Sequence, residues 1–205
     1  MKKTIVKSLA ATAVLLVAVF STQAQEKLQL KIGYNISTPV GTFKDEINKT
    51  SFRGFSGELA YPLNNRLQIG LGVLYNDYYQ KYPRAVYNTG EGAVSAVITN
   101  SIQTLPILAK VNYSLVKEGF VKPYIGLGAG GNLITYKQYL GEFPTSKTAI
   151  KPAVNGDAGV NIALGKTKTA GVNLGANFNY LPFNYNGIDN LNNWGAHAGI
   201  FFKLR

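Results

Sequence analysis

The single histidine of this chain, His197, is the first candidate for chemistry, because an imidazole ring binds metals and transfers protons near neutral pH. Glu58 and Asp157 are the carboxylates that would have to join it. The chain has no cysteine, so a thiolate metal site and a disulfide framework are both excluded. We expect His197 to be a hydrogen-bonded structural residue, and we expect no metal, no cofactor and no enzymatic activity.

Charged residues in predicted strands form a second candidate group. The group consists of Lys31, Glu58, Lys110, Lys151 and Asp157, with His197 beside them. If these strands close into a narrow barrel, charges that point into its lumen must pair, because an isolated buried ion costs several kcal/mol. One interpretation is an internal salt-bridge network that plugs the lumen, and the other is a gated, weakly selective ion path. We favour the plug.

The segments that carry these residues have the two-residue period of β-strands. In residues 66–77, for example, Leu67, Ile69, Leu71, Val73 and Tyr75 alternate mainly with glycine and glutamine. Eight such segments follow one another without a convincing amphipathic helix. They span residues 28–40, 52–62, 66–77, 98–114, 120–138, 148–164, 169–182 and 191–204. Several exceed the roughly five or six residues that are common in soluble strands.

The connections between the segments alternate in length. Short turns occupy residues 62–66, 116–120 and 165–168, and long connections occupy residues 41–51, 78–97, 140–147 and 183–190. Four loops at one end, with three turns and both termini at the other, are typical of outer-membrane barrels. The pattern predicts an all-β fold: an eight-stranded antiparallel up-and-down transmembrane β-barrel in residues 25–205.

The two faces of the segments differ in polarity. Predicted outward residues such as Ile107, Leu174 and Ile200 are apolar, whereas predicted inward residues such as Asn112 and Asn173 are polar. The apolar face would meet lipid, and the polar and small residues would fill a lumen only wide enough for side chains. A soluble, lipocalin-like periplasmic barrel would instead be apolar inside, so we favour that alternative least.

Aromatic residues gather near the segment ends. Tyr61, Tyr113, Phe120 and Phe202 lie near the short turns, and Tyr75, Tyr78, Tyr136, Tyr139, Tyr180 and Trp194 lie near the long connections. Two such bands are typical of the girdles at the two membrane interfaces. The longest connection carries Tyr82, Arg84 and Tyr87, which we expect to face the outside of the cell as a surface for an unknown partner.

The N-terminus has the features of a secretory signal peptide. A basic start is followed by an apolar run from Leu9 to Phe20 and by small residues that place the cut after Ala24, so residues 1–24 would be removed. The apolar run is shorter than the ~20 residues that a membrane-spanning helix needs. The mature chain is therefore expected to be exported.

The chain is basic, but its basic residues are scattered. The formal charge of +11 falls to +8 when Lys2, Lys3 and Lys7 leave with the signal peptide. No basic helix or aromatic–basic motif is present, which argues against nucleic-acid binding. Scattered lysines and arginines suit a surface of anionic lipid or lipopolysaccharide better.

Three stretches carry a resemblance to a known family. "LPILAKVNYSL" (105–115), "PYIGLGAGGNLI" (123–134) and "GAHAGIFFKL" (195–204), together with the signal peptide, resemble the small eight-stranded outer-membrane β-barrels of Gram-negative bacteria, a group of OmpA-barrel-like, OmpW-like and PorT-like domains. The resemblance implies the cell outer membrane as location and insertion by the barrel-assembly machinery. We expect a monomer with a structural or surface-interaction role. The alternatives are a narrow pore, an OmpW-like conduit for small molecules, or a PorT-like secretion component.

Overall fold

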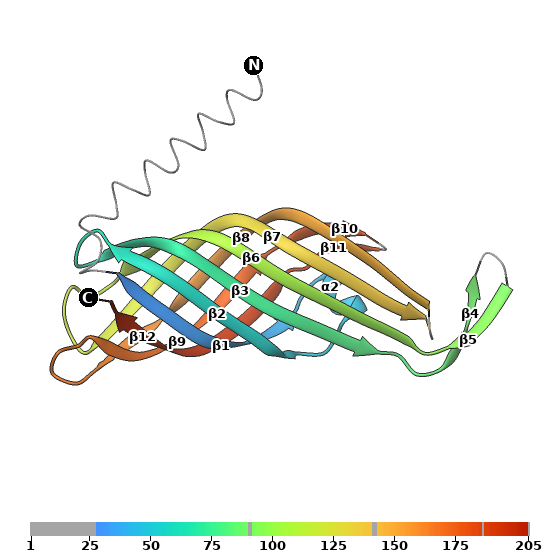
Figure 1. Cartoon of the computed structure of the whole chain (residues 1–205), viewed down its shortest axis with the longest axis horizontal. Helices are drawn as coiled ribbons and strands as arrows, with labels where there is room; N and C mark the ends of the chain where they lie inside the picture. The colour runs from blue at the N-terminus through green and yellow to red at the C-terminus, as the bar shows by residue number, and fades with distance from the viewer. Residues whose placement is uncertain (1–27, 90–91, 141–142, 186, 205) are drawn as a thin grey trace, which may run out of the picture.

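The long strands of the protein close into one antiparallel barrel in chain order (Figure 1). The computed structural model describes residues 28–89, 92–140, 143–185 and 187–204. Within them the order around the barrel is β1, β2, β3, β6, β7, β8, β9 and β12, and β12 pairs back to β1. The predicted eight-stranded antiparallel up-and-down barrel is therefore confirmed. The predicted signal peptide, residues 1–24, lies outside the described residues.

The barrel strands differ in length around the wall. The strands are β1 (Gln29–Pro39), β2 (Ser51–Pro62), β3 (Leu67–Lys81), β6 (Ile98–Ser114), β7 (Val121–Leu140), β8 (Phe143–Leu164), β9 (Ala170–Tyr180) and β12 (Asn193–Lys203). The side formed by β3, β6, β7 and β8 is taller, because these strands have 15 to 22 residues and the other four have 11 or 12. Pairing of β8 with β9 begins only at Val154, so residues 143–153 of β8 form an open sheet edge.

Short elements occupy three of the four connections predicted as long loops. Helix α2 (Thr42–Glu46) follows β1, the hairpin of β4 (Ala85–Thr89) and β5 (Gly92–Ala96) follows β3, and the hairpin of β10 (Pro182–Tyr185) and β11 (Ile188–Asn190) follows β9. The fourth predicted loop, 140–147, is largely taken up by the extended ends of β7 and β8.

The two ends of the barrel differ. We call the end that carries α2 and the two hairpins the loop end, and the opposite end, with the three tight turns, the turn end (Figure 1). The start of β1 and the C-terminal end of β12 both lie at the turn end. Among the described residues, α2 is the only helix, and none is long and apolar enough to cross a membrane.

The two faces of the wall match the predicted alternation. Outward side chains such as Leu71, Ile107 and Leu127 are exposed, and Leu127 keeps 70% of its surface. Inward glycines make room for larger neighbours: a Cβ added at Gly72 would lie 2.7 Å from Cδ of Lys110, and one at Gly175 would lie 2.7 Å from Cε1 of His197. The outside is thus a continuous apolar band, and the lumen is filled by side chains.

Candidate functional site

Four charged side chains meet in the lumen near the middle of the barrel, and we call them the charge network. Glu58 accepts hydrogen bonds from Nζ of Lys31 at 2.9 Å and from Nζ of Lys110 at 2.8 Å. Lys110 also donates to Asp157 at 3.0 Å. These side chains are nearly buried, with 7–10% of their surface exposed. Two cations therefore balance two anions, which is the condition under which buried charges are tolerated.

Neutral donors and rings complete the charge network. Asn112 donates to Oε1 of Glu58 at 2.6 Å, and Nζ of Lys31 lies 5.0 Å from the ring centre of Tyr124. The Tyr124 hydroxyl donates to Asp157 at 3.5 Å and lies 3.3 Å from Nε2 of His197. His197 stands 4.0 Å from Asp157, within an enclosed polar cluster.

Most strands of the barrel contribute to this cluster. Lys31 comes from β1, Glu58 from β2, Lys110 from β6, Tyr124 from β7, Asp157 from β8 and His197 from β12. Such a cluster joins strands that are not neighbours, so it ties opposite sides of the wall together. Asn173 also belongs to the cluster, because it donates to the Tyr124 hydroxyl at 3.1 Å. The sequence pattern does not single out Tyr124, Asn112 or Asn173 for the cluster. Their inward register was the available signal, since Tyr124 shares the face of Lys122 and Gly126.

A layer of amides lies above the charge network, toward the loop end. The amide layer consists of Asn35, Asn76, Asn155, Asn177, Asn179 and Asn193. Asn35 donates to Asn76 at 2.8 Å, and Asn179 donates to both Asn177 at 2.9 Å and Asn193 at 2.8 Å. Every amide of this layer takes part in at least one hydrogen bond with another member, although Nδ2 of Asn76 has no partner within the part of the chain that the structure describes.

An apolar cap closes the lumen at the loop end. Its buried members are Phe43, Ile47, Tyr78, Ile102, Leu108, Ile134, Tyr136, Ala153, Leu181, Phe183, Ile188 and Leu191. Phe43 of α2 packs edge-to-face on Tyr78 with ring centres 4.8 Å apart. Asn190 donates to Thr42 at 3.0 Å and so joins the β10–β11 hairpin to α2. The sequence pattern does not predict this cap, because it predicts open loops where α2 and the β10–β11 hairpin lie.

Lys151 does not join the charge network, which corrects its predicted placement. It follows the inward register of Asp157, but it lies on the part of β8 that has no β9 neighbour, and its side chain is exposed. The barrel wall is incomplete at that height, so an inward direction no longer means burial. Lys31, Glu58, Lys110, Asp157 and His197 are brought together as described above.

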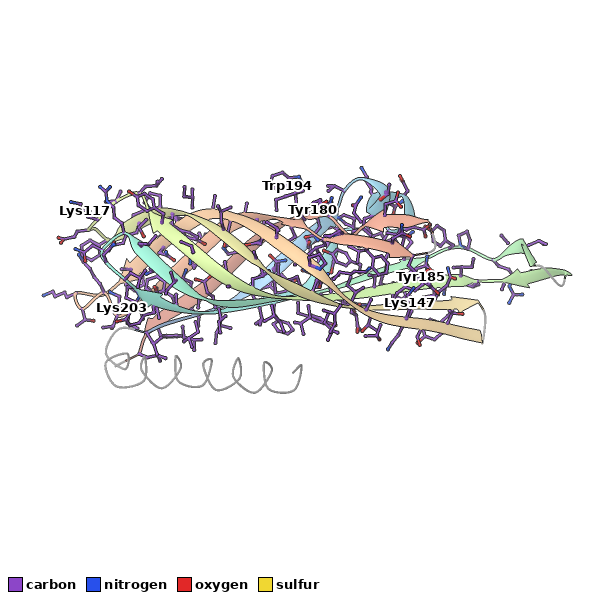
Figure 2. The ribbon with its side chains drawn as sticks, turned by 90° about the horizontal axis from the view of Figure 1, so that it is seen from above. Lys117, Lys147, Tyr180, Tyr185, Trp194 and Lys203 are labelled. Carbon is purple, nitrogen blue, oxygen red and sulfur yellow. The ribbon has the colours of Figure 1, made fainter. Side chains whose placement is uncertain are left out.

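The predicted girdle residues divide into two groups. Tyr61, Tyr75, Tyr113, Phe120, Tyr139, Tyr180, Trp194 and Phe202 are exposed or half-buried. Tyr180 and Trp194 lie on the wall of the barrel part way along its length (Figure 2). The predicted place at a membrane interface is wrong for Tyr78 and Tyr136, because both are buried in the apolar cap. The alternation already implied this: Tyr78 is an odd number of residues from outward Tyr75, and Tyr136 an odd number from outward Leu133.

The three residues of the longest connection that are predicted to form a surface for a partner have different environments. Arg84 is exposed. Tyr82 is half-buried, and its hydroxyl donates to the carbonyl oxygen of Glu46 at 2.7 Å, so it ties the loop to α2. Tyr87 lies in β4 opposite Val94 of β5, and its side chain lies outside the described part of the structure.

Space inside the barrel is limited at the charge network. A cavity of about 50 Å³ is lined by Lys31, Glu58, Lys110, Asp157 and His197 among others. This volume accommodates a few water molecules and no larger solute. Among the described residues, no group of three histidine or carboxylate side chains is arranged to hold a metal ion. The lumen chemistry is thus ion pairing and hydrogen bonding.

Comparisons with known proteins agree with this architecture. A family model described as "Outer membrane protein beta-barrel domain" matches residues 9–202. The crystal structure of OprG from Pseudomonas aeruginosa has a TM-score of 0.57 and 13% identity, covering 87% of this chain and 96% of that chain. Neisserial surface protein A has a TM-score of 0.51 and 17% identity, covering 86% and 95%. At such identities the likeness establishes the fold alone. No curated protein matches the chain.

Proposed function

The chain belongs to the outer membrane protein beta-barrel domain family, and on this basis we propose that it is a closed, non-enzymatic barrel that serves as a scaffold for surface interaction. Its location is the cell outer membrane. The observation that carries the proposal is the filling of the lumen in three successive layers: the charge network, the amide layer and the apolar cap. A solute passing through would have to displace all three.

The pore and conduit alternatives require a continuous path through these layers. The apolar cap opposes a water-filled path, because apolar constrictions exclude water and ions. The charge network, which lies closer to the turn end, also opposes a water-filled path, because moving Lys110 aside breaks its ion pairs with both Glu58 and Asp157.

Conductance across a planar lipid bilayer tests the closed barrel. Purified wild-type protein is expected to give no discrete conductance steps in potassium chloride, with an established porin as the control for reconstitution. Lys110→Gln serves as the diagnostic variant, because a pore lined by the charge network would change its ion selectivity when one lysine is neutralised. Steps in the wild type that change selectivity in this variant would establish a pore and contradict the proposal.

The loop end supplies the surface for interaction under this proposal. The β4–β5 hairpin projects beyond the barrel wall (Figure 1), and long connections of outer-membrane barrels face the outside of the cell. A photo-crosslinking residue at exposed Arg84 is expected to give an adduct of defined mass on intact cells. The same residue at Lys166, in a tight turn of the turn end, is the control. Adducts at neither position would leave the barrel with a structural role alone and contradict the interaction role.

A further inference from the structure

A second, larger cavity opens at the turn end of the barrel. Its volume is about 330 Å³, and it shares no lining residue with the cavity at the charge network. This volume falls at the lower end of the range of small-molecule sites, which begins at roughly 300 Å³. Polar side chains line much of it, including Gln29, Gln68 and Asn161. The cavity is thus large and polar enough for a small hydrated ligand.

Three lysines converge on this cavity, and we call Lys122, Lys168 and Lys203 the lysine mouth. Lys122 and Lys203 follow the inward register of β7 and β12, and Lys168 reaches in from the turn between β8 and β9. Figure 2 shows Lys203 at this end of the molecule. Lys122 and Lys168 repel the charge of Lys203. Three like charges around one cavity raise its affinity for an anion.

The charges of the lysine mouth are not balanced by carboxylates among the described residues. No aspartate or glutamate lines the cavity, and none of the three lysines takes part in a salt bridge there. Nζ of Lys122 donates to the carbonyl oxygen of Lys117 at 3.0 Å, and Nζ of Lys168 lies 4.4 Å from the ring centre of Phe120. The charge network shows the opposite arrangement, since each of its lysines has a carboxylate partner.

The backbone at Lys168 supports a role for this side chain. Its φ of 51° lies in the left-handed region, and within the described part of the chain it is the one non-glycine residue with a positive φ. A lysine in this region costs conformational energy that glycine or asparagine would reduce. The strained turn holds the Lys168 ammonium beside Phe120 at the rim of the cavity.

We propose that the lysine mouth binds a phosphate-bearing anion with two or more negative charges. Lysine ammonium groups act on phosphate as point charges, whereas a planar carboxylate is matched best by the fork of an arginine, and no arginine lines this cavity. Nε2 of Gln68 donates to Oε1 of Gln29 at 3.1 Å, and the remaining N–H groups of these two amides are further donors for the anion. A soluble phosphate ester and the headgroup of an anionic phospholipid share this chemistry. The inference does not depend on the interaction role of the loop end, which lies at the opposite end of the barrel.

Calorimetric titration of pyrophosphate tests the lysine mouth. The full mature protein is held in nanodiscs of phosphatidylcholine, and Lys168→Gln and Lys203→Gln are each expected to weaken pyrophosphate binding about tenfold, as expected for loss of one charge-assisted contact. Lys166→Gln is the matched control, because it removes an exposed positive charge from the same turn without touching the cavity. Heat-dependent gel mobility verifies that every variant is folded.

A second experiment, on bound lipid, distinguishes a soluble phosphate ester from a phospholipid headgroup. Protein extracted from phosphatidylglycerol membranes is examined by native mass spectrometry, alongside a variant with all three lysines of the mouth changed to glutamine. One additional phospholipid on the wild type supports a headgroup ligand, and pyrophosphate binding without retained lipid supports a soluble one. The proposal is overturned if neither pyrophosphate nor lipid binds, or if Lys166→Gln weakens binding as much as Lys168→Gln does.

Discussion

Removing one charge from the lumen is predicted to destabilise the barrel more than removing a matched pair. Glu58→Met leaves Lys31 without its carboxylate and leaves Lys110 with Asp157 alone, so the lumen gains one uncompensated positive charge. Breaking a buried ion pair in this way costs about 3–5 kcal/mol of unfolding free energy. Lys31→Met creates the opposite imbalance, because Glu58 and Asp157 then share Lys110, and we expect a loss of similar size.

The double variant Lys31→Met/Glu58→Met restores neutrality. Lys110 and Asp157 remain as a balanced pair at 3.0 Å, and two methionines fill the vacated volume. The double variant also loses the contacts that Glu58 makes with Lys110 and Asn112, but it leaves no charge unpaired and removes two buried charges together, so it should lie within about 2 kcal/mol of the wild type. It is therefore expected to be more stable than either single variant.

Urea unfolding in lipid vesicles measures this difference. Trp194 is the only tryptophan, and it is exposed on the outer wall, so its fluorescence reports the loss of the lipid contact on unfolding. Gel mobility confirms that all variants start from the folded barrel. If the loss in the double variant equals the sum of the two single losses, Lys31 and Glu58 do not act as a pair and the reasoning is refuted.

Three further predictions concern the membrane face, the topology and the apolar cap. Leu71→Arg places a charge on the lipid face and should cost ~2–4 kcal/mol near the bilayer centre, whereas inward Gln68→Lys should cost much less; equal shifts of the urea midpoint would show that the faces are assigned wrongly. In intact cells an impermeant thiol reagent should label Arg84→Cys and spare Lys166→Cys, and the reverse pattern would mean an inverted barrel. Phe43→Ala should cost about 3–5 kcal/mol if the cap is as tightly packed as a protein core, as judged by the same unfolding assay, and a loss below 1 kcal/mol would contradict that packing.

The barrel itself was predictable because its signals are local. Alternation within each strand is visible in the sequence, and it assigned Lys31, Lys110 and Asn173 to the lumen without knowledge of any partner. The ion pairs followed from the same reasoning, since charges confined to a narrow lumen must pair. Prediction of the fold therefore rests on the period of the strands and on the lengths of the turns.

The apolar cap was not predictable because its contacts are not local. Helix α2 is a five-residue segment, too short to show a helical period, and it forms where the chain turns at Gly41, whose φ is 63°. Phe43 meets Tyr78 only after the barrel has closed. The error at Lys151 has a related cause, since the height at which β9 stops is a tertiary property that the sequence of β8 does not contain.

The open edge of β8 has a consequence for neighbouring molecules. An unpaired strand edge is a template for another strand, and copies of such a barrel crowded in a membrane would tend to associate edge to edge and aggregate. Residues 143–153 oppose this with Pro144 and Pro152, which lack the backbone N–H of a ladder, and with exposed Lys151. Nζ of Lys147 lies 4.1 Å from the ring centre of Tyr185, so the β10–β11 hairpin also contacts β8 along this edge (Figure 2). The lysine that is absent from the lumen network thus helps to keep neighbouring barrels apart.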